Sequence, residues 1–220
     1  MKERWEMGAN AGIVKRSFGF ALRRTLFTDV VQGAIAGGVL AFFTANLLIN
    51  TEVKAMQRKV EGWSTTFQPG VHQNGILRRA AMAKYIPAAN LPEEAVYWTA
   101  KVDGVGHALN GQHDYVLHFP PGGLPPNNAF WSVTMTDPQR RMVDNPIHRY
   151  TVGDRSALMP GADGSVDIFL QNGAPAGHES NWLPTPPGDF MLWLRVYLPS
   201  AAILNGQYNV PPVVEVRTKP

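Results

Sequence analysis

The chain has 220 residues, which is enough for one sizeable hydrophobic core but short for several domains. It contains no cysteine, which excludes disulfide bonds, cysteine nucleophiles and thiolate metal sites. Its net charge of +3 includes six basic residues that precede position 30, so the remainder is close to neutral and gives no reason to expect nucleic-acid binding.

Residues 1–28 predict a cytoplasmic arm that forms a basic amphipathic helix. Val14, Phe18, Leu22 and Leu26 recur every four residues, with lysine and arginine side chains between them. Helices of this kind lie in the interface of an anionic membrane leaflet. We therefore expect the arm to contact anionic lipid and a membrane protein partner, with a solvated tail as the alternative.

Residues 29–50 predict a single transmembrane helix. Positions 30–49 carry no charged side chain, and at ~1.5 Å per residue such a helix is about 30 Å long, the thickness of the hydrocarbon core of a bilayer. A cleaved signal peptide and a buried core helix are the alternatives. The stretch is longer than the roughly 7–15 apolar residues of a signal peptide and lacks a clean Ala-x-Ala site, although Arg23-Arg24 gives faint support for twin-arginine export.

The charges on either side of this helix predict its orientation. Six basic residues precede it, whereas Lys54, Arg58 and Lys59 follow it and are partly offset by Glu52 and Glu61. Because positive charge is retained on the cytoplasmic side, we expect an inner-membrane protein with its N-terminus in the cytoplasm and its C-terminal part in the bacterial periplasm.

Glycines inside the span predict a packing face. Gly33 and Gly37 lie four residues apart, Gly38 follows at once, and the polar Gln32 and Asn46 add groups that favour an interhelical partner in lipid. Ordinary transmembrane glycines are the alternative. We expect a membrane protein partner along this face.

Residues 51–92 predict a short helical connector. A polar helix is expected to continue over 51–60, with Trp63 as an interfacial anchor. A second helix is expected over 75–86, where good helix formers end before Pro87.

Residues 93–220 predict an antiparallel β-sandwich or a jelly roll. Short strand-like runs alternate with turn signals rich in Gly, Pro and Asn. The expected strands are 95–102, 113–119, 129–136, 147–152, 166–170, 190–198 and 213–217.

The same region resembles a bacterial family, the domain of unknown function 1214, which often follows a sister domain, 1254. Several separate blocks carry the resemblance in order, among them Leu109-Asn110-Gly111, YVLHF at 115–119, FWSVT at 130–134, NPIHRY at 145–150, NWLP at 181–184 and LRVY at 194–197. The resemblance implies a jelly-roll β-sandwich and transfers no catalytic role. Residues 50–92 are too short for the sister domain.

The strand at 190–198 supplies the main candidate binding residues. Strict alternation places Phe190, Leu192, Leu194, Val196 and Leu198 in the core. The opposite face carries Trp193, Arg195 and Tyr197, a composition that is enriched at recognition surfaces. The alternative is a covered sheet face on which Arg195 pairs with Asp137 or Glu215.

Asn181 and Trp182 are further candidates for the rim of a binding site, with structural capping as the alternative. His148 and Arg149 offer a possible general base beside a cation, but no nucleophile accompanies them at motif spacing. His107, His113 and His118 lack the spacing of metal ligands, so we expect no metal and no cofactor.

Two functions of different classes follow. The first is a non-catalytic accessory or scaffold subunit of an inner-membrane complex. The second is an anchored periplasmic enzyme or binding protein for a glycan or another small envelope ligand. The enzyme would require at least two of Asp137, His148, Arg149, Asn181 and Arg195 to share a pocket.

Overall fold

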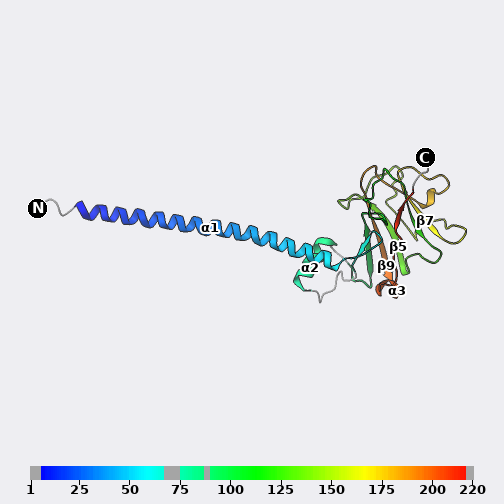
Figure 1. The fold of residues 1–220 in the computed structure, drawn as a ribbon, viewed down its shortest axis with the longest axis horizontal. Coiled ribbons are helices and arrows are strands. Elements are labelled where there is room, and N and C mark those ends of the chain that lie inside the picture. Colours follow the sequence, from blue (N-terminus) through cyan, green and yellow to red (C-terminus); the bar gives the residue numbers. More distant parts are fainter. Residues whose placement is uncertain (1–5, 67–74, 87–89, 217–220) are drawn as a thin grey trace. The chain divides into compact units, whose positions relative to one another are not determined.

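The computed structural model describes residues 6–66, 75–86 and 90–216, with side chains described from residue 27 onward (Figure 1). The chain divides into two compact units, residues 1–51 and 52–220. The described residues of the first unit, 6–51, are helical, and the second unit contains all the described strands.

Helix α1 runs unbroken over Glu6–Met56. Its segment Phe27–Met56 is the one helix in the described part of the chain that is long and apolar enough to cross a membrane. None of its most apolar window is buried, so by length and composition it suits a membrane anchor or a signal sequence. The helix predicted over 29–50 is confirmed as a helix. The side chains of the predicted basic arm lie mostly outside the described residues, so its amphipathic role stays a prediction.

Ten strands form two sheets. The larger sheet has the order β1-β2-β3-β9-β5-β6, and the smaller has the order β10-β4-β7-β8. The larger sheet contains β1 (Arg58–Val60), β2 (Trp63–Thr65), β3 (Ala95–Ala100), β5 (Asn127–Thr136), β6 (Thr151–Gly153) and β9 (Met191–Pro199). The smaller contains β4 (Tyr115–Phe119), β7 (Val166–Gln171), β8 (Trp182–Pro184) and β10 (Val213–Glu215).

Both sheets contribute to one hydrophobic core. Alternate residues of the central strand β9, such as Leu192 and Leu194, are fully buried against residues of the smaller sheet such as Leu117 and Ile168. Strands β5 and β9 run side by side (Figure 1). The mainly β fold predicted from the turn-rich sequence is therefore confirmed.

One strand pair departs from the predicted antiparallel arrangement. β7 pairs with β8 in parallel, with Phe169 opposite Trp182, so the smaller sheet is mixed. The chain between them includes the 3-10 helix η1 (Glu179–Asn181), and this crossover returns β8 in the direction of β7. β8 has only three residues, too few to show a strand period in the sequence.

The connector is also less helical than predicted. α1 ends at Met56, and the predicted helix over 51–60 is replaced beyond it by the hairpin β1–β2, which joins the edge of the larger sheet. Trp63 is 2% exposed and donates a 2.8 Å hydrogen bond to the Pro211 carbonyl, so it is a core residue and the interfacial-anchor prediction is wrong. The second predicted helix is confirmed as α2 (Ile76–Tyr85).

The predicted alternation fails at one position of β9. Leu198 is 48% exposed, whereas the four other residues predicted for that face are buried. Its φ of 47° lies in the left-handed region, which interrupts the extended backbone and turns the side chain away from the core. A short helix, α3 (Ala201–Leu204), follows directly.

Candidate functional site

The candidate site lies on the outer face of the larger sheet, the face directed away from the core. Trp193 on β9 pairs with Thr99 on β3 and with Thr134 on β5, and Thr99 pairs with Ser64 on β2. Directly opposed residues project to the same side of a sheet. Their neighbour Leu192 belongs to the core, so this row occupies the other face.

A cavity of about 450 Å³ lies over part of this row. Hairpin β1–β2, strands β3 and β9, the end of α2 and the loop after β5 all contribute to it. Its apolar wall includes Val60, Trp63, Tyr85, Val102, Met191 and Trp193. We call this the outer-face cavity. Its volume lies within the roughly 300–1,000 Å³ typical of small-molecule sites.

Two polar atoms of residues that line the outer-face cavity lack a hydrogen-bond partner among the described residues. They are the indole Nε1 of Trp193 and the hydroxyl Oγ of Ser64. Trp193 is only 7% exposed. A buried donor without an acceptor costs about 1–3 kcal/mol, so such groups require an explanation. Both atoms are fully buried, so a ligand in the cavity does not reach them unless side chains move.

Arg140 covers this region with its guanidinium group. The guanidinium carbon lies 5.6 Å from the centre of the Trp193 ring and 5.8 Å from the centre of the Tyr85 ring. Nη1 also donates a 2.6 Å hydrogen bond to the main-chain carbonyl of Tyr85, the last residue of α2. The φ of Arg140 is 68°, a left-handed conformation that is uncommon outside glycine and often marks functional loops.

The turn that carries Arg140 is organised by Asp137. The Asp137 carbonyl accepts the Arg140 N–H, and its carboxylate accepts the Arg141 main-chain N–H at 2.9 Å and the Arg141 Nε at 2.7 Å. The main-chain N–H of Arg141 is the largest cause that holds the pKa of Asp137 below its usual value, followed in the same direction by the Arg141 side chain. The alternative from the sequence in which Asp137 pairs with Arg195 is therefore wrong, because Asp137 pairs with Arg141.

The charged residues around the cavity are mainly positive. Lys59, Lys101 and Arg140 line it together with a single carboxylate, that of Glu61. Lys59, Lys101 and Arg140 are all exposed, as a cavity mouth requires. The outer-face cavity therefore combines an apolar wall with an entrance that carries mainly positive charge.

The predicted binding residues of β9 share a face but not a cavity. Trp193 lines the outer-face cavity, whereas Arg195 and Tyr197 lie further along the strand. The Tyr197 ring stacks on Phe130 at a centroid distance of 4.4 Å, and the Arg155 guanidinium lies 4.0 Å above the Phe130 ring. This second aromatic group is half-buried surface beside the cavity.

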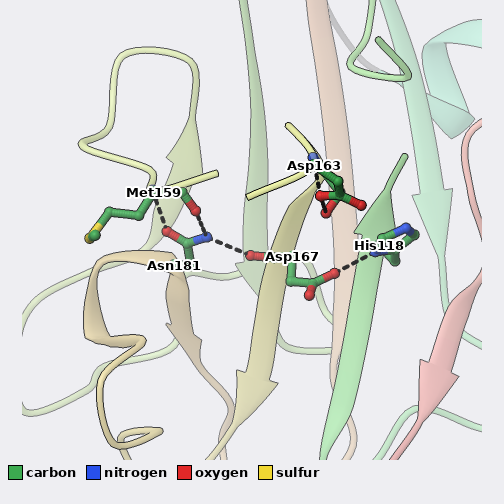
Figure 2. Close-up of polar contacts among 6 residues, drawn as sticks. His118, Met159, Asp163, Asp167 and Asn181 are labelled. Carbon is green, nitrogen blue, oxygen red and sulfur yellow. Dashed lines mark hydrogen bonds and ion pairs between the residues drawn. The ribbon is translucent and has the colours of Figure 1, made fainter. Parts of the chain in front are cut away.

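Asn181 ends η1 and Trp182 begins β8 of the smaller sheet, apart from the β9 residues. Figure 2 shows the Asn181 amide bridging Met159 and Asp167, and it accepts the Met159 N–H at 2.7 Å while it donates to the two main-chain carbonyls at 2.8 and 2.9 Å. Trp182 donates its indole N–H to the Gln171 carbonyl at 2.8 Å. These contacts fix the crossover into β8, which is the structural capping considered from the sequence.

The same close-up includes two exposed carboxylates. Asp167 accepts a 2.6 Å bond with His118 across β7 and β4 (Figure 2). Asp163 accepts both the hydroxyl and the N–H of Ser165, and the hydroxyl is the largest cause that lowers the pKa of Asp163. The carboxylates of Asp163 and Asp167 therefore have hydrogen-bond partners within the chain.

An enzyme would require at least two of the five candidate residues in one pocket. Arg149 donates to the main-chain carbonyls of Glu179 and Trp182, on either side of Asn181 in the sequence, and His148 is an exposed residue 4.0 Å from Asp144. Asp137 follows β5, and Arg195 lies on β9. None of the five lines the outer-face cavity.

A further polar cluster escaped the sequence reasoning. Ligand atoms of Asp103, His107 and Glu215 lie within 4.8 Å of one another. Asp103 is 2% exposed, and its Oδ1 accepts the N–H groups of Val105 and His107, while Glu215 pairs with His113 at 3.0 Å. These bonds close the loop after β3. Glu215 is distant in sequence, so no local spacing signalled the cluster.

Comparisons with known proteins agree with the family resemblance. Residues 94–201 match the family model described as "Protein of unknown function (DUF1214)", which confirms the family suggested by the sequence blocks. A comparison with curated proteins gave no match.

Two solved structures are similar to parts of the chain. The VPA0106 protein from Vibrio parahaemolyticus is 29% identical with a TM-score of 0.58, over 66% of this chain and 36% of that protein. The chain thus spans about a third of its length. An uncharacterized protein from Burkholderia cenocepacia is 16% identical over 83% of this chain and 43% of that one, with a TM-score of 0.43, too low to carry an argument.

Proposed function

Residues 94–201 match the DUF1214 family model, and from this premise we propose that the chain is a membrane-anchored protein whose β domain binds a small ligand. The outer-face cavity carries the proposal, because its volume suits a small molecule and it combines an apolar wall that includes Trp193 with a mainly cationic entrance. Ligand binding without turnover fits the cavity better than an enzyme does, because the candidate catalytic residues lie elsewhere.

We propose that the β domain lies on the periplasmic side of the bacterial inner membrane. Segment Phe27–Met56 supports an anchor by its length and apolar surface, and the excess of basic residues before it supports a cytoplasmic N-terminus. In this arrangement the two sheets form a jelly-roll sandwich, as the family resemblance implies, and the outer-face cavity receives ligands of the cell envelope.

A fluorescent probe tests ligand binding directly. The full chain in phosphatidylcholine nanodiscs is titrated with N-phenyl-1-naphthylamine and with its sulfonated relative, 8-anilinonaphthalene-1-sulfonate. Energy transfer from tryptophan to the probe is measured after subtraction of empty nanodiscs. We expect saturable binding of at least one probe, with one site per chain. Absence of saturable binding of both probes would refute the proposal.

A cavity-filling variant locates the site. Ser64→Phe places a ring on the cavity side of β2, and we expect it to abolish saturable binding because the added volume occupies the cavity. Val116→Phe is the matched control, since Val116 is a half-buried strand residue of the smaller sheet. Probe binding that survives Ser64→Phe while the fold is intact would place the site elsewhere.

A second candidate function is an accessory subunit of a membrane complex. It is supported by Gly33, Gly37 and Gly38, where an added Cβ would meet nothing within 4 Å, so the helix surface is open there. A partner helix could approach this face closely. The candidate is compatible with ligand binding, and its test is given in the Discussion.

A further inference from the structure

We infer that the ligand of the outer-face cavity is an organic anion whose apolar body is the size of one or two rings. The inference rests on the proposed function and adds the chemical class of the ligand. Three features support it: the charge of the entrance, the position of the Arg140 guanidinium, and the apolar wall around Trp193.

The entrance favours a negative ligand. Among the described residues that line the cavity, three are cationic and one is anionic, which leaves an excess of positive charge where a ligand must pass. They are Lys59, Lys101 and Arg140, and Glu61. Charges of one sign around a concave site raise the local concentration of the opposite ion. A cationic ligand would be repelled here, and a neutral ligand would gain nothing from these side chains.

Arg140 is placed to contact the anionic group itself. Its bond to the Tyr85 carbonyl uses one N–H of the guanidinium fork and fixes the group above the Tyr85 and Trp193 rings. A guanidinium held in this way presents a planar set of donors that suits carboxylate, sulfonate or phosphate groups. The anion is therefore expected beside Arg140, with the rest of the ligand directed toward the sheet.

The apolar wall of the cavity indicates that the ligand is more than a bare inorganic ion. Val102, Met191 and Trp193 form an apolar wall that phosphate or sulfate would leave in contact with water. A ring-containing body would cover this wall.

The two probes of the previous subsection test the charge preference, because they share the same ring system and differ by one sulfonate. We expect the wild-type chain to bind the sulfonated probe about tenfold more tightly than the neutral one, as a charge-assisted contact would give. Equal affinities, or tighter binding of the neutral probe, would overturn the inference and leave ligand binding intact.

Three variants assign the preference to named groups. Arg140→Gln and Lys101→Gln should each reduce the preference for the sulfonated probe several-fold, whereas Arg155→Gln should leave it unchanged, because Arg155 lies over Phe130 and does not line the cavity. Lys101→Gln keeps the test valid if Arg140→Gln disturbs α2. A preference that both variants retain would overturn the inference.

Trp193→Phe tests the apolar wall, since it keeps an aromatic ring but reduces its area. We expect it to weaken both probes to a similar extent, because they share one ring system, and to leave the charge preference in place. Competition by benzoate or by dioctanoyl phosphatidylglycerol then separates a soluble anion from an anionic lipid as the source. Displacement by neither would overturn the organic-anion assignment.

Discussion

The Nη1 of Arg140 donates a 2.6 Å hydrogen bond to the Tyr85 carbonyl, which joins the turn after β5 to the last residue of α2. This contact bridges two segments that are 55 positions apart in the sequence. It also places the guanidinium over the Trp193 ring. A single side chain thus connects the position of α2 to the shape of the outer-face cavity.

Removal of this contact should loosen α2 without unfolding the β domain. We expect Arg140→Gln to destabilise the docked helix by about 1 kcal/mol, because an exposed hydrogen bond has a modest net value. Hydrogen exchange of the amides of Ile76–Tyr85 should accelerate about fivefold, while β9 amides are unaffected. Arg155→Gln, at an arginine that lies over Phe130, is the control, and equal acceleration in both variants would contradict the assignment to Arg140.

Asn181 should be a major determinant of stability. Asn181→Ala removes one acceptor and two donated bonds at a residue that is 4% exposed, so main-chain groups of Met159 and Asp167 lose their partners. We expect a loss of about 2–4 kcal/mol in the free energy of unfolding, measured by urea titration. Asp167→Asn, which affects only the exposed pair with His118, should cost less than about 1 kcal/mol.

The Asp163–Ser165 pair should make stability sensitive to acid. The folded-state pKa of Asp163 is lowered from 3.8, chiefly by the Ser165 hydroxyl. Its contribution to stability is therefore present above that value and is lost as the pH falls through the lower folded value. Ser165→Ala should raise the pKa of Asp163 toward its usual value, which an NMR titration of the carboxyl measures. An unchanged pKa would contradict the assignment.

Gly153 should not tolerate a side chain. A Cβ there would lie 2.1 Å from the Trp131 carbonyl oxygen, a main-chain atom that cannot easily move. We expect Gly153→Ala to destabilise the β domain by about 1–3 kcal/mol, seen as a lower Tm in thermal unfolding. Gly173→Ala is the control, because a Cβ there meets nothing within 4 Å. Similar Tm values for both variants would refute the steric argument.

The glycine face of α1 should be needed for assembly if the chain acts as an accessory subunit. Gly37→Leu adds volume where the chain itself leaves space, so the β domain should keep its Tm. We expect the variant to lose a partner that the wild-type chain retains in native mass spectrometry from mild detergent. Phe42→Leu, a change at a 65% exposed residue, serves as the control. An isolated wild-type monomer would count against the accessory function.

Local pattern was sufficient for much of the fold. The alternation at Leu192, Leu194 and Val196 predicted a core-facing strand, and these residues are fully buried. Residues 75–86 contain good helix formers before a proline, and α2 lies within that range. Both predictions depend on side-chain periods and backbone limits that act within a few residues.

The missed elements depend on distant partners. β1, β2 and β8 have three residues each, too few to show a period, and they are strands because Trp63 meets Ala100 and Trp182 meets Phe169 across the sheets. The outer-face cavity was only partly predictable for the same reason. Trp193 followed from alternation, but Arg140 reached the site through a left-handed turn that no spacing signals.

The central place of β9 also sets the order in which the domain can form. β9 lies between β3 and β5, so Ala95 of β3 cannot pair with Tyr197 until β9 has been synthesised. Contacts between segments so far apart slow folding, since a long loop must close before they form. As the chain is synthesised from its N-terminus, hairpin β1–β2 and strand β3 emerge with an unpaired edge. We therefore expect the β domain to fold late and in a nearly all-or-none step. We also expect chaperones to bind the incompletely synthesised chain.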